Sequence, residues 1–281
     1  MAGEGGVGGG PEERRRYLPI PAAELPAQLA LSPLPPALQR PQVFTFDTER
    51  FPFRAVVAEI LGVRECELER LQDTEPGRAA LQAELAGANH RKRGRGPHFS
   101  RLWLGSVGSP ARARFDRILD RFMREFVCQR QGGGRVAYQK QPTFRVVLPS
   151  ALPAGYLHCD ADYHHPPSEL NWWLPLTQVS GNNTLHCESS PGLADFTPVE
   201  LQYGQVLRFY GNLCRHFTRP NDTTSCRVSF DTRVVTEAQH PPAWTDRLGR
   251  PCLFRVGGYY THWKGCEEED EPQADKNHCF V

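Results

Sequence analysis

The sequence predicts an α+β protein in which short antiparallel strands form a barrel or jelly roll and helices pack outside it. Three observations lead to this fold class. An amphipathic helix is expected over residues 109–131, a run of three glycines follows it, and the hydrophobic period then changes from about 3.6 to about two. The 281 residues can bury one substantial core, so we expect one main domain with a helical subdomain.

The N-terminal residues 1–40 are rich in glycine, proline and alanine. Such a composition cannot bury enough apolar surface to order itself independently, so we expect a flexible segment that is either a mobile tail or a strap. Residues 41–134 are predicted to form a helical subdomain that packs on the barrel. Within it, the basic cluster from Arg91 to Arg95 is interpreted as a solvated loop, with a nuclear address or a phosphate contact as alternatives.

The clearest helix begins at Ser109, a good N-cap, with Pro110 at the first helical position. Apolar side chains recur at steps of three and four along it, as expected of a helix that lies on a core. These residues are Phe115, Ile118, Leu119, Phe122, Met123, Phe126 and Val127. The glycines from Gly132 onward end the helix.

Short strands are predicted from this point almost to the C-terminus, separated by turns that contain Gly, Pro, Asn and Ser. Their expected ranges are 143–148, 170–176, 184–188, 205–210, 214–218, 225–235 and 253–260. Strands of this kind indicate an antiparallel barrel or jelly roll. We therefore assign residues 135–262 to the barrel and residues 263–281 to an acidic, flexible tail.

Composition excludes several classes of protein. The net charge is +1, with 33 basic and 32 acidic residues, so nothing global favours nucleic acid or a membrane surface as a partner. No apolar run is long enough to span a bilayer. Nine cysteines without a CxxC pair argue against a disulfide framework or a structural zinc site. Reduced thiols in a cytoplasmic protein are the simpler interpretation, and the basic cluster leaves the nucleus open.

A metal site is predicted at His158, Asp160 and His216. Alternate residues of an extended chain point to the same face, so His158 and Asp160 can address one ion. His216 supplies a third ligand from a later strand. Two imidazoles and one carboxylate on one face of an octahedron are the ligand set of non-haem Fe(II) oxygenases, which leaves the opposite positions for co-substrate and oxygen.

An anion-binding strand follows the last of these ligands. Arg227 and Ser229 lie on one face of it, where a guanidinium and a hydroxyl can jointly bind the distal carboxylate of 2-oxoglutarate. Val228, Phe230 and Val234 lie on the opposite face, which we expect to pack on a helix layer. The alternative is that Arg227 forms half of a surface ion pair.

Several motifs between about residues 139 and 260 carry a family resemblance. They are Gln141-Pro142-Thr143-Phe144-Arg145, His158-Cys159-Asp160-Ala161-Asp162-Tyr163, Glu169-Leu170-Asn171-Trp172-Trp173-Leu174-Pro175-Leu176-Thr177, Arg215-His216 and Arg227-Val228-Ser229-Phe230-Asp231-Thr232-Arg233-Val234. In their order and spacing the chain resembles the phytanoyl-CoA-dioxygenase-like 2-oxoglutarate oxygenases, and within them most closely the streptomycin-biosynthesis hydroxylase-like proteins.

The resemblance implies a double-stranded β-helix, which is a cupin-like jelly roll. It also implies Fe(II), 2-oxoglutarate and dioxygen as cofactor and co-substrates, and it leaves ascorbate open as a reductant. Asn171 and Trp173 are implied to line the co-substrate pocket. The expected activity is hydroxylation of a small molecule with release of succinate and CO2, because Asp160 retains the carboxylate that related halogenases lack.

Two other functions are kept as alternatives. One is a hydroxylase or demethylase that acts on protein or nucleic acid, and the other is a catalytically inactive cupin-like binding protein. Three polar residues near the ligand strand are candidate substrate contacts. His164 and His165 either contact substrate or form a solvated turn, and Glu169 either contacts substrate or braces a neighbouring strand. Trp172 and Trp173 point to opposite faces, so one should be packed and the other should face the cavity.

Overall fold

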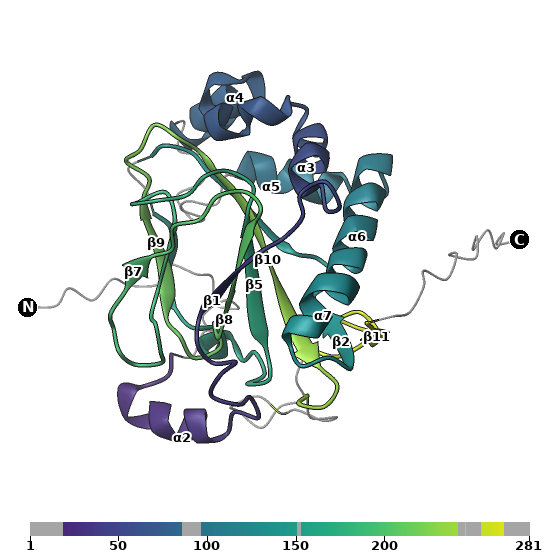
Figure 1. Cartoon of the computed structure of the whole chain (residues 1–281). Coiled ribbons are helices and arrows are strands. Elements are labelled where there is room, and N and C mark those ends of the chain that lie inside the picture. The colour runs from purple at the N-terminus through teal and green to yellow at the C-terminus, as the bar shows by residue number, and fades with distance from the viewer. Residues whose placement is uncertain (1–18, 86–96, 151–152, 241–244, 246–253, 267–281) are drawn as a thin grey trace, which may run out of the picture.

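Two antiparallel sheets form the centre of the molecule, and they are visible side by side in the computed structural model (Figure 1). The structure describes residues 19–85, 97–150, 153–240, 245 and 254–266. The larger sheet contains β1 (Gln42–Thr45), β8 (Gln205–Phe209), β5 (Leu170–Pro175), β10 (Arg227–Thr236), β2 (Arg135–Tyr138), β11 (Lys264–Gly265) and β3 (Thr143–Val147). The smaller sheet contains β4 (Pro153–His158), β9 (His216–Pro220), β6 (Leu185–Cys187) and β7 (Thr197–Pro198). The predicted α+β class with antiparallel strands is confirmed.

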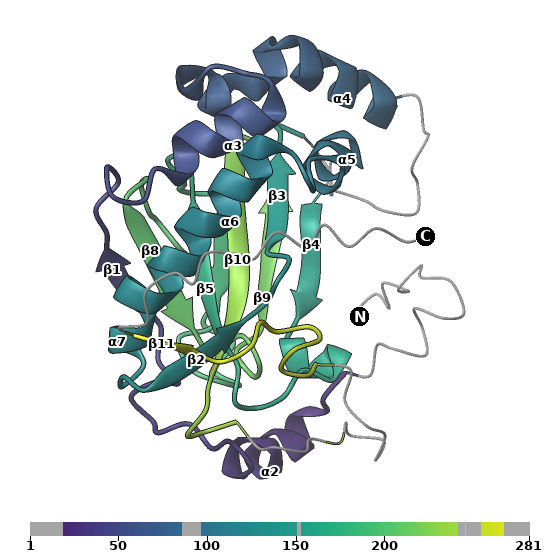
Figure 2. The ribbon, with the colours of Figure 1, turned by 90° about the vertical axis from the view of Figure 1, so that its right-hand side faces the viewer.

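Helices cover the outer face of the larger sheet, where Figure 2 shows α3, α6 and α7 in front of β5, β8 and β10. The helical elements are η1 (Ala22–Glu24), α2 (Leu25–Ala30), α3 (Phe53–Leu61), η2 (Glu65–Asp73), α4 (Glu75–Leu85), α5 (Pro97–Gly105), α6 (Pro110–Phe122), the π-helix η3 (Met123–Val127), α7 (Cys128–Arg130) and η4 (Asp160–Tyr163). No helix in the described part of the chain is both long enough and apolar enough to cross a membrane.

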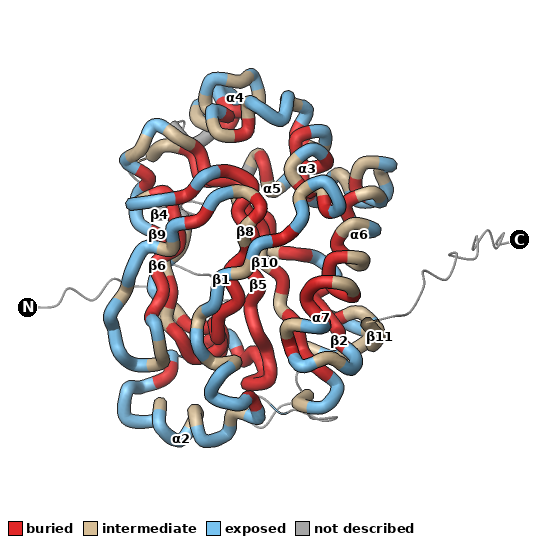
Figure 3. Tube along the Cα trace, viewed as in Figure 1, coloured by how far each residue is buried: buried red, intermediate tan, exposed pale blue. Residues whose placement is uncertain are grey.

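The predicted helix start is confirmed, because Ser109 accepts a hydrogen bond from the backbone N–H of Arg112 at 3.2 Å. The apolar stripe of this helix is buried against the larger sheet, and Figure 3 shows the buried strands and helix faces in red. Phe115 meets Phe230 of β10 with 5.3 Å between ring centroids. The helical path continues to Arg130 through a π-helical turn that the sequence period does not reveal.

Strand β10 is the central strand of the larger sheet. It pairs with β5 along one edge, and along the other it pairs first with β3 and then with β2. Val228, Phe230 and Val234 belong to the core beneath the helices, as their alternation predicts. The intervening Arg227 and Arg233 line a cavity instead. The strand therefore presents its polar side to the space between the two sheets.

Of the two interpretations of the N-terminal segment, residues 19–40 fit the strap, because they pack against the two sheets. Ile20 and Leu34 are buried with the apolar residues of β5, β6 and β8. The backbone N–H of Ile20 donates to Asp162 at 2.8 Å, and Arg215 donates to the carbonyl of Ile20 at 3.0 Å. These contacts join the proline-rich strap to the sheets, although it has no core of its own.

Two domain boundaries also differ from the prediction. Residues 42–45, which were assigned to the helical subdomain, form β1 and pair with β8. Phe44 of this strand stacks on Trp172, with 5.5 Å between the ring centroids. Residues 254–260 form no strand, although isolated bridges join Tyr260 to Gln139 and Val256. The predicted tail begins too early, since β11 pairs with β2. Edge pairing depends on distant partners, which a local pattern does not encode.

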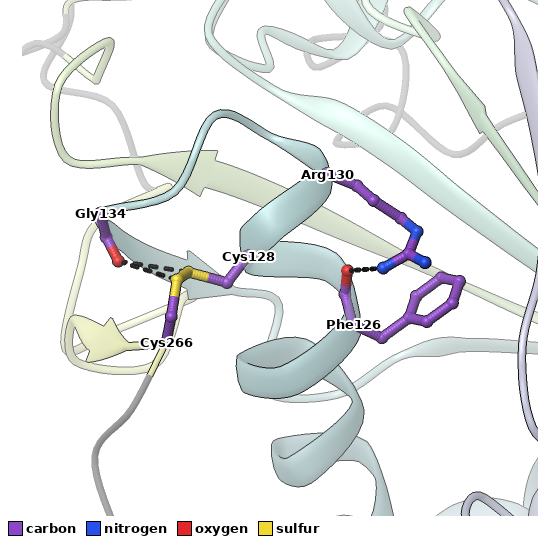
Figure 4. Close-up of a disulfide and its surroundings, with 5 residues drawn as sticks. All are labelled: Phe126, Cys128, Arg130, Gly134 and Cys266. Carbon is purple, nitrogen blue, oxygen red and sulfur yellow. Dashed lines mark hydrogen bonds between the residues drawn. A yellow bond between two sulfur atoms is a disulfide. The ribbon is translucent and has the colours of Figure 1, made fainter.

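A disulfide joins Cys128 at the start of α7 to Cys266 after β11 (Figure 4). The two residues are 138 positions apart, and their Cα atoms lie 5.7 Å apart. The expectation of reduced thiols is therefore wrong for this pair. The absence of a CxxC motif says nothing about cysteines that only the fold brings together. Cys159, Cys187, Cys214 and Cys226 are free and buried, whereas Cys66 is free and exposed.

Two predicted features fall on residues outside the described ranges. They are the basic cluster at residues 91–95 and the acidic residues 267–271.

Candidate metal centre

His158 and His216 lie directly opposite each other on the paired strands β4 and β9. Their ring centroids are 4.4 Å apart. The Nδ1 atom of His158 lies 2.7 Å from the carbonyl of Tyr156, and the Nδ1 atom of His216 lies 3.0 Å from that of Cys214. A carbonyl only accepts, so each Nδ1 donates and each Nε2 keeps a free lone pair for a metal.

Asp160 completes the set, but the predicted reason for its position is wrong. His158 is the last residue of β4 and Asp160 is the first of η4, so a turn rather than strand alternation places the carboxylate. The backbone N–H of Asp160 donates to the carbonyl of Gly211 at 2.8 Å and fixes this turn. Asp160 Oδ1 lies 4.0 Å from Nε2 of His158 and 3.9 Å from Nε2 of His216. One ligand atom from each residue lies within 4.8 Å of the others.

The electrostatics of this site favour metal binding. Burial lowers the pKa of His158 to about 4, and burial also lowers the pKa of His216. Both imidazoles are therefore neutral at neutral pH, which is their ligand form. Burial alone would raise the pKa of Asp160, but the adjacent Arg233 guanidinium holds it well below its usual range. The three donors are thus two neutral imidazoles and one carboxylate, which fits a ferrous ion.

A small cavity that opens to solvent lies beside these residues, between the two sheets. Its charged wall consists of three arginines, Arg145, Arg227 and Arg233, and one carboxylate, Asp231. The remaining wall, apart from the ligand histidines, consists of Gly155, Asn171, Trp173, Leu185, Phe209, Phe217 and Thr218. Three guanidinium groups thus face two carboxylates when Asp160 is counted, so the site carries an excess of positive charge that suits an anion.

Arg227 is almost completely buried, with 1% of its surface exposed. Burial, with the nearby Arg145 as a second cause, lowers the pKa of Arg227 to about 9, so the side chain still carries its charge at neutral pH. Among the described residues, neither Nε of Arg227 nor the hydroxyl of Ser229 has a hydrogen-bond partner. A buried donor without a partner is costly, and a bound carboxylate would remove that cost.

Asn171 and Trp173 both line the cavity, on the same face of β5. The amide of Asn171 donates to Oδ2 of Asp160 at 2.8 Å. The Trp173 ring centroid lies 6.0 Å from Cζ of Arg227. Trp172 points the other way and stacks on Phe44, so Trp173 is the tryptophan that faces the cavity.

The three candidate substrate contacts occupy a different place. His164, His165 and Glu169 are buried, and they are absent from the cavity wall formed by the described residues. His165 Nδ1 lies 3.0 Å from Oε1 of Glu169, and the hydroxyl of Tyr260 also donates to this carboxylate. Of the two interpretations for Glu169, the structure favours the brace. His165 also stacks on Phe254, with 3.8 Å between ring centroids.

Sequence reasoning did not assign Arg145, Asp231 and Arg233 to the site. Alternation could have found two of them, because Asp231 and Arg233 lie on the same face of β10 as Arg227. Arg145 is placed by pairing, since it stands opposite Ser229 in the register of β3 and β10. The sequence pattern alone does not give that register.

No protein-family model matches the chain. The streptomycin biosynthesis protein StrG of Streptomyces griseus is 38% identical over 125 residues, which are 44% of this chain and 59% of StrG. Among solved structures, the nickel complex of the non-haem monooxygenase ThoJ has a TM-score of 0.43 and 18% identity, and the match covers 85% of this chain and 88% of ThoJ. EctD from S. alaskensis in its apoform gives a TM-score of 0.40 and 16% identity, over 75% of this chain and 80% of EctD.

The complete ligand set and the similarity to StrG support the relationship that the sequence motifs indicated. The convergence of His158, Asp160 and His216 is the observation that a chance HxD motif would not produce. The predicted resemblance to a streptomycin biosynthesis protein is thus confirmed over part of the chain, and the three predicted ligand residues lie together as a candidate metal site.

Proposed function

We propose that this protein is an Fe(II)- and 2-oxoglutarate-dependent dioxygenase that hydroxylates a small molecule and releases succinate and CO2. The observation that carries the proposal is the convergence of His158, Asp160 and His216 beside buried Arg227, whose Nε has no hydrogen-bond partner among the described residues. In this proposal the two antiparallel sheets are the halves of a double-stranded β-helix, and the cavity between them is the reaction chamber.

The three ligands would hold the iron on one face and leave the opposite positions open. When bound, the iron with 2-oxoglutarate and dioxygen supplies the oxidising power that removes hydrogen from a substrate C–H bond. His158 and His216 contribute neutral imidazoles, each oriented by a backbone carbonyl. Asp160 contributes the negative charge, which its ionised state makes available at neutral pH.

Arg227 and Ser229 would bind the distal carboxylate of 2-oxoglutarate, with Arg145 adding positive charge from the neighbouring strand. Asn171 and Trp173 would form the wall along this co-substrate. The apolar side chains of Leu185, Phe209 and Phe217 complete the cavity. They would limit access of water and so strengthen the charge interactions inside.

A small-molecule substrate is favoured over protein or nucleic acid. The relative that is 38% identical over 125 residues is named as a protein of streptomycin biosynthesis. The near-neutral charge of the whole chain offers no support for nucleic acid. An inactive binding protein has no need of all three ligands together with Arg227. Ascorbate is proposed only as an additive to test in the assay.

The test is succinate formation that requires both Fe(II) and 2-oxoglutarate. We expect His158→Ala, Asp160→Ala and His216→Ala to reduce turnover to background, whereas His98→Ala on α5, outside the site, should retain it. Arg227→Lys should raise the KM for 2-oxoglutarate by roughly 10- to 100-fold, because it loses a charge-assisted hydrogen bond of about 1.5–3 kcal/mol. Unchanged turnover in all three ligand variants would contradict the proposal. A purified protein that binds no iron would instead favour the inactive binding protein.

A further inference from the structure

Asp160 has more hydrogen-bond partners than its role as a ligand requires. Its Oδ2 accepts from Arg233 Nε at 3.0 Å and from Asn171 Nδ2 at 2.8 Å. Its Oδ1 accepts from Arg233 Nη2 at 3.1 Å. A carboxylate offers about four lone-pair positions, two on each oxygen. The two donors to Oδ2 therefore fill that oxygen, and one position is left on Oδ1.

The remaining position is on the oxygen that faces the histidines, since Oδ1 is the atom 4.0 Å and 3.9 Å from their Nε2 atoms. We propose that Arg233 and Asn171 are positioning residues for Asp160. Together they occupy both lone-pair positions of Oδ2 and one of the two on Oδ1, so that Asp160 presents a single lone pair to the metal. This inference rests on the proposed metal centre. It concerns how the carboxylate is held, which the ligand motif does not specify.

The guanidinium of Arg233 is itself held from several sides. Nη1, the nitrogen that does not reach Asp160, donates to Gln139 at 3.3 Å and to the hydroxyl of Tyr259 at 3.4 Å. Nε lies 3.7 Å from the carboxylate of Glu169, which also accepts from Tyr260. Only 13% of the Arg233 side chain is exposed. A fork fixed on both sides can hold a carboxylate in one orientation, which a flexible side chain cannot do.

One consequence is an open coordination position. A carboxylate that is free to rotate can chelate a metal through both oxygens. It would then occupy a coordination position that a co-substrate or dioxygen needs. With Oδ2 filled by two donors, chelation would cost two hydrogen bonds. A second consequence concerns charge, because Arg233 offsets the charge of Asp160 and leaves the cavity more attractive to an anion. In this proposal Arg233 thus acts through Asp160.

The experiment uses Co(II) alone as a probe, bound to the metal-free full-length protein. The readouts are the visible absorption of Co(II), the Co–O and Co–N distances from X-ray absorption, and the Kd. Arg233→Lys keeps the charge but cannot span both oxygens, and Arg233→Met removes both contacts. Asn171→Ala removes one donor to Oδ2 in a smaller change that should fold even where an arginine variant does not.

We expect the same two changes in Arg233→Lys, Arg233→Met and Asn171→Ala. A second carboxylate oxygen of Asp160 should enter the Co(II) coordination shell. The Kd for Co(II) should change by about 10- to 100-fold, the range found when a residue that orients a metal ligand is removed. Thr143→Val is the matched control. Its hydroxyl lies 3.5 Å from Nη1 of Arg233, on the side away from Asp160, so its Co(II) spectrum should equal that of the wild type.

Wild-type spectra and Kd values in all three variants would overturn the inference. A wild-type result in Arg233→Lys with a change in Arg233→Met would also overturn it, because charge alone would then be sufficient. These outcomes are distinct from failure of the proposed function, in which the wild-type protein itself gives no Co(II) spectrum.

Discussion

Burial of the His158 side chain makes the stability of the folded protein depend on pH. Burial lowers its folded-state pKa to about 4, compared with 6.5 for the free side chain. Below pH 6.5 the unfolded chain therefore takes up a proton that the folded chain does not. The folded state loses stability as the pH falls from 6.5 to about 4, and this loss is complete below that value.

We expect this effect to lower the free energy of unfolding of the metal-free protein by up to about 3 kcal/mol across that window, at 1.36 kcal/mol per pKa unit. Urea unfolding at a series of pH values measures it. The variant His158→Asn should lose this part of the slope, while the contributions of other groups stay the same. Equal slopes for the variant and the wild type would show that His158 takes up its proton in the folded state as readily as in the unfolded one.

Gly211 is the residue whose missing side chain matters most to the site. A Cβ atom there would lie 2.6 Å from Oδ1 and 2.9 Å from Nδ2 of Asn171. Asn171 cannot move away without breaking its hydrogen bond to Asp160. We expect Gly211→Ala to destabilise the protein by about 1–3 kcal/mol, as overpacking does, and to weaken Co(II) binding.

Thermal unfolding and Co(II) titration together check this prediction. Gly105→Ala is the control, because a Cβ at that residue meets nothing within 4 Å. Normal stability and Co(II) binding in Gly211→Ala would mean that the Asn171 amide has room to shift, and that its contact with Asp160 is not fixed by Gly211.

Among the elements, α6 shows how a local signal sets the position of a core helix. The N-cap hydrogen bond of Ser109 satisfies a backbone donor that the first turn would otherwise leave open. The same helix carries Phe115 and Phe122 into the aromatic core above β10. The start of the helix and the face it buries are both local properties, and both were predicted correctly.

Ser109→Ala should lower the free energy of unfolding by about 1 kcal/mol, the usual cost of losing such a cap. Denaturant unfolding measures the change. Ser109→Asp should restore most of the loss, because its carboxylate can accept the same hydrogen bond at a helix N-terminus. Ser106→Ala is a neighbouring control whose hydroxyl donates to the Trp103 carbonyl. A Ser109→Ala variant as stable as the wild type would mean that water replaces the cap at no cost.

At the scale of the whole molecule, the disulfide connects the C-terminal residues to the helix layer, next to the glycine turn where the Gly134 carbonyl lies 3.2 Å from Cys128 Sγ (Figure 4). The segment that it anchors supplies Tyr259 and Tyr260 to the buried network around Arg233 and Glu169. A link across 138 residues restricts the unfolded chain strongly, and this is the main source of its stabilising effect.

Cys266→Ala should lower the free energy of unfolding by about 2–4 kcal/mol under non-reducing conditions. Denaturant unfolding with and without a reducing agent measures the effect. With the reducing agent present, the wild type should fall to the level of the variant. Cys66→Ala, which removes an exposed free thiol, should change neither curve. No difference between reduced and oxidised wild-type protein would show that the bond adds nothing to the fold.

The sequence by itself determined the properties that depend on neighbours along the chain. These include the start of α6 and the face of β10 that carries Arg227. Hydrophobic period, capping chemistry and strand alternation act over a few residues, so a pattern can encode them. Strand alternation also predicted the opposite orientations of Trp172 and Trp173, although it did not indicate which of the two faces the cavity.

Only the tertiary structure decided which distant groups meet. Arg233 binds Asp160 from 73 positions away, Ile20 binds Asp162 from 142 positions away, and Cys128 pairs with Cys266. Asp160 itself is placed by a turn fixed to Gly211 and not by the alternation of its strand. Such contacts depend on sheet register and on how the layers pack. Those are set by the summed burial of the whole core, and no local stretch of residues specifies them.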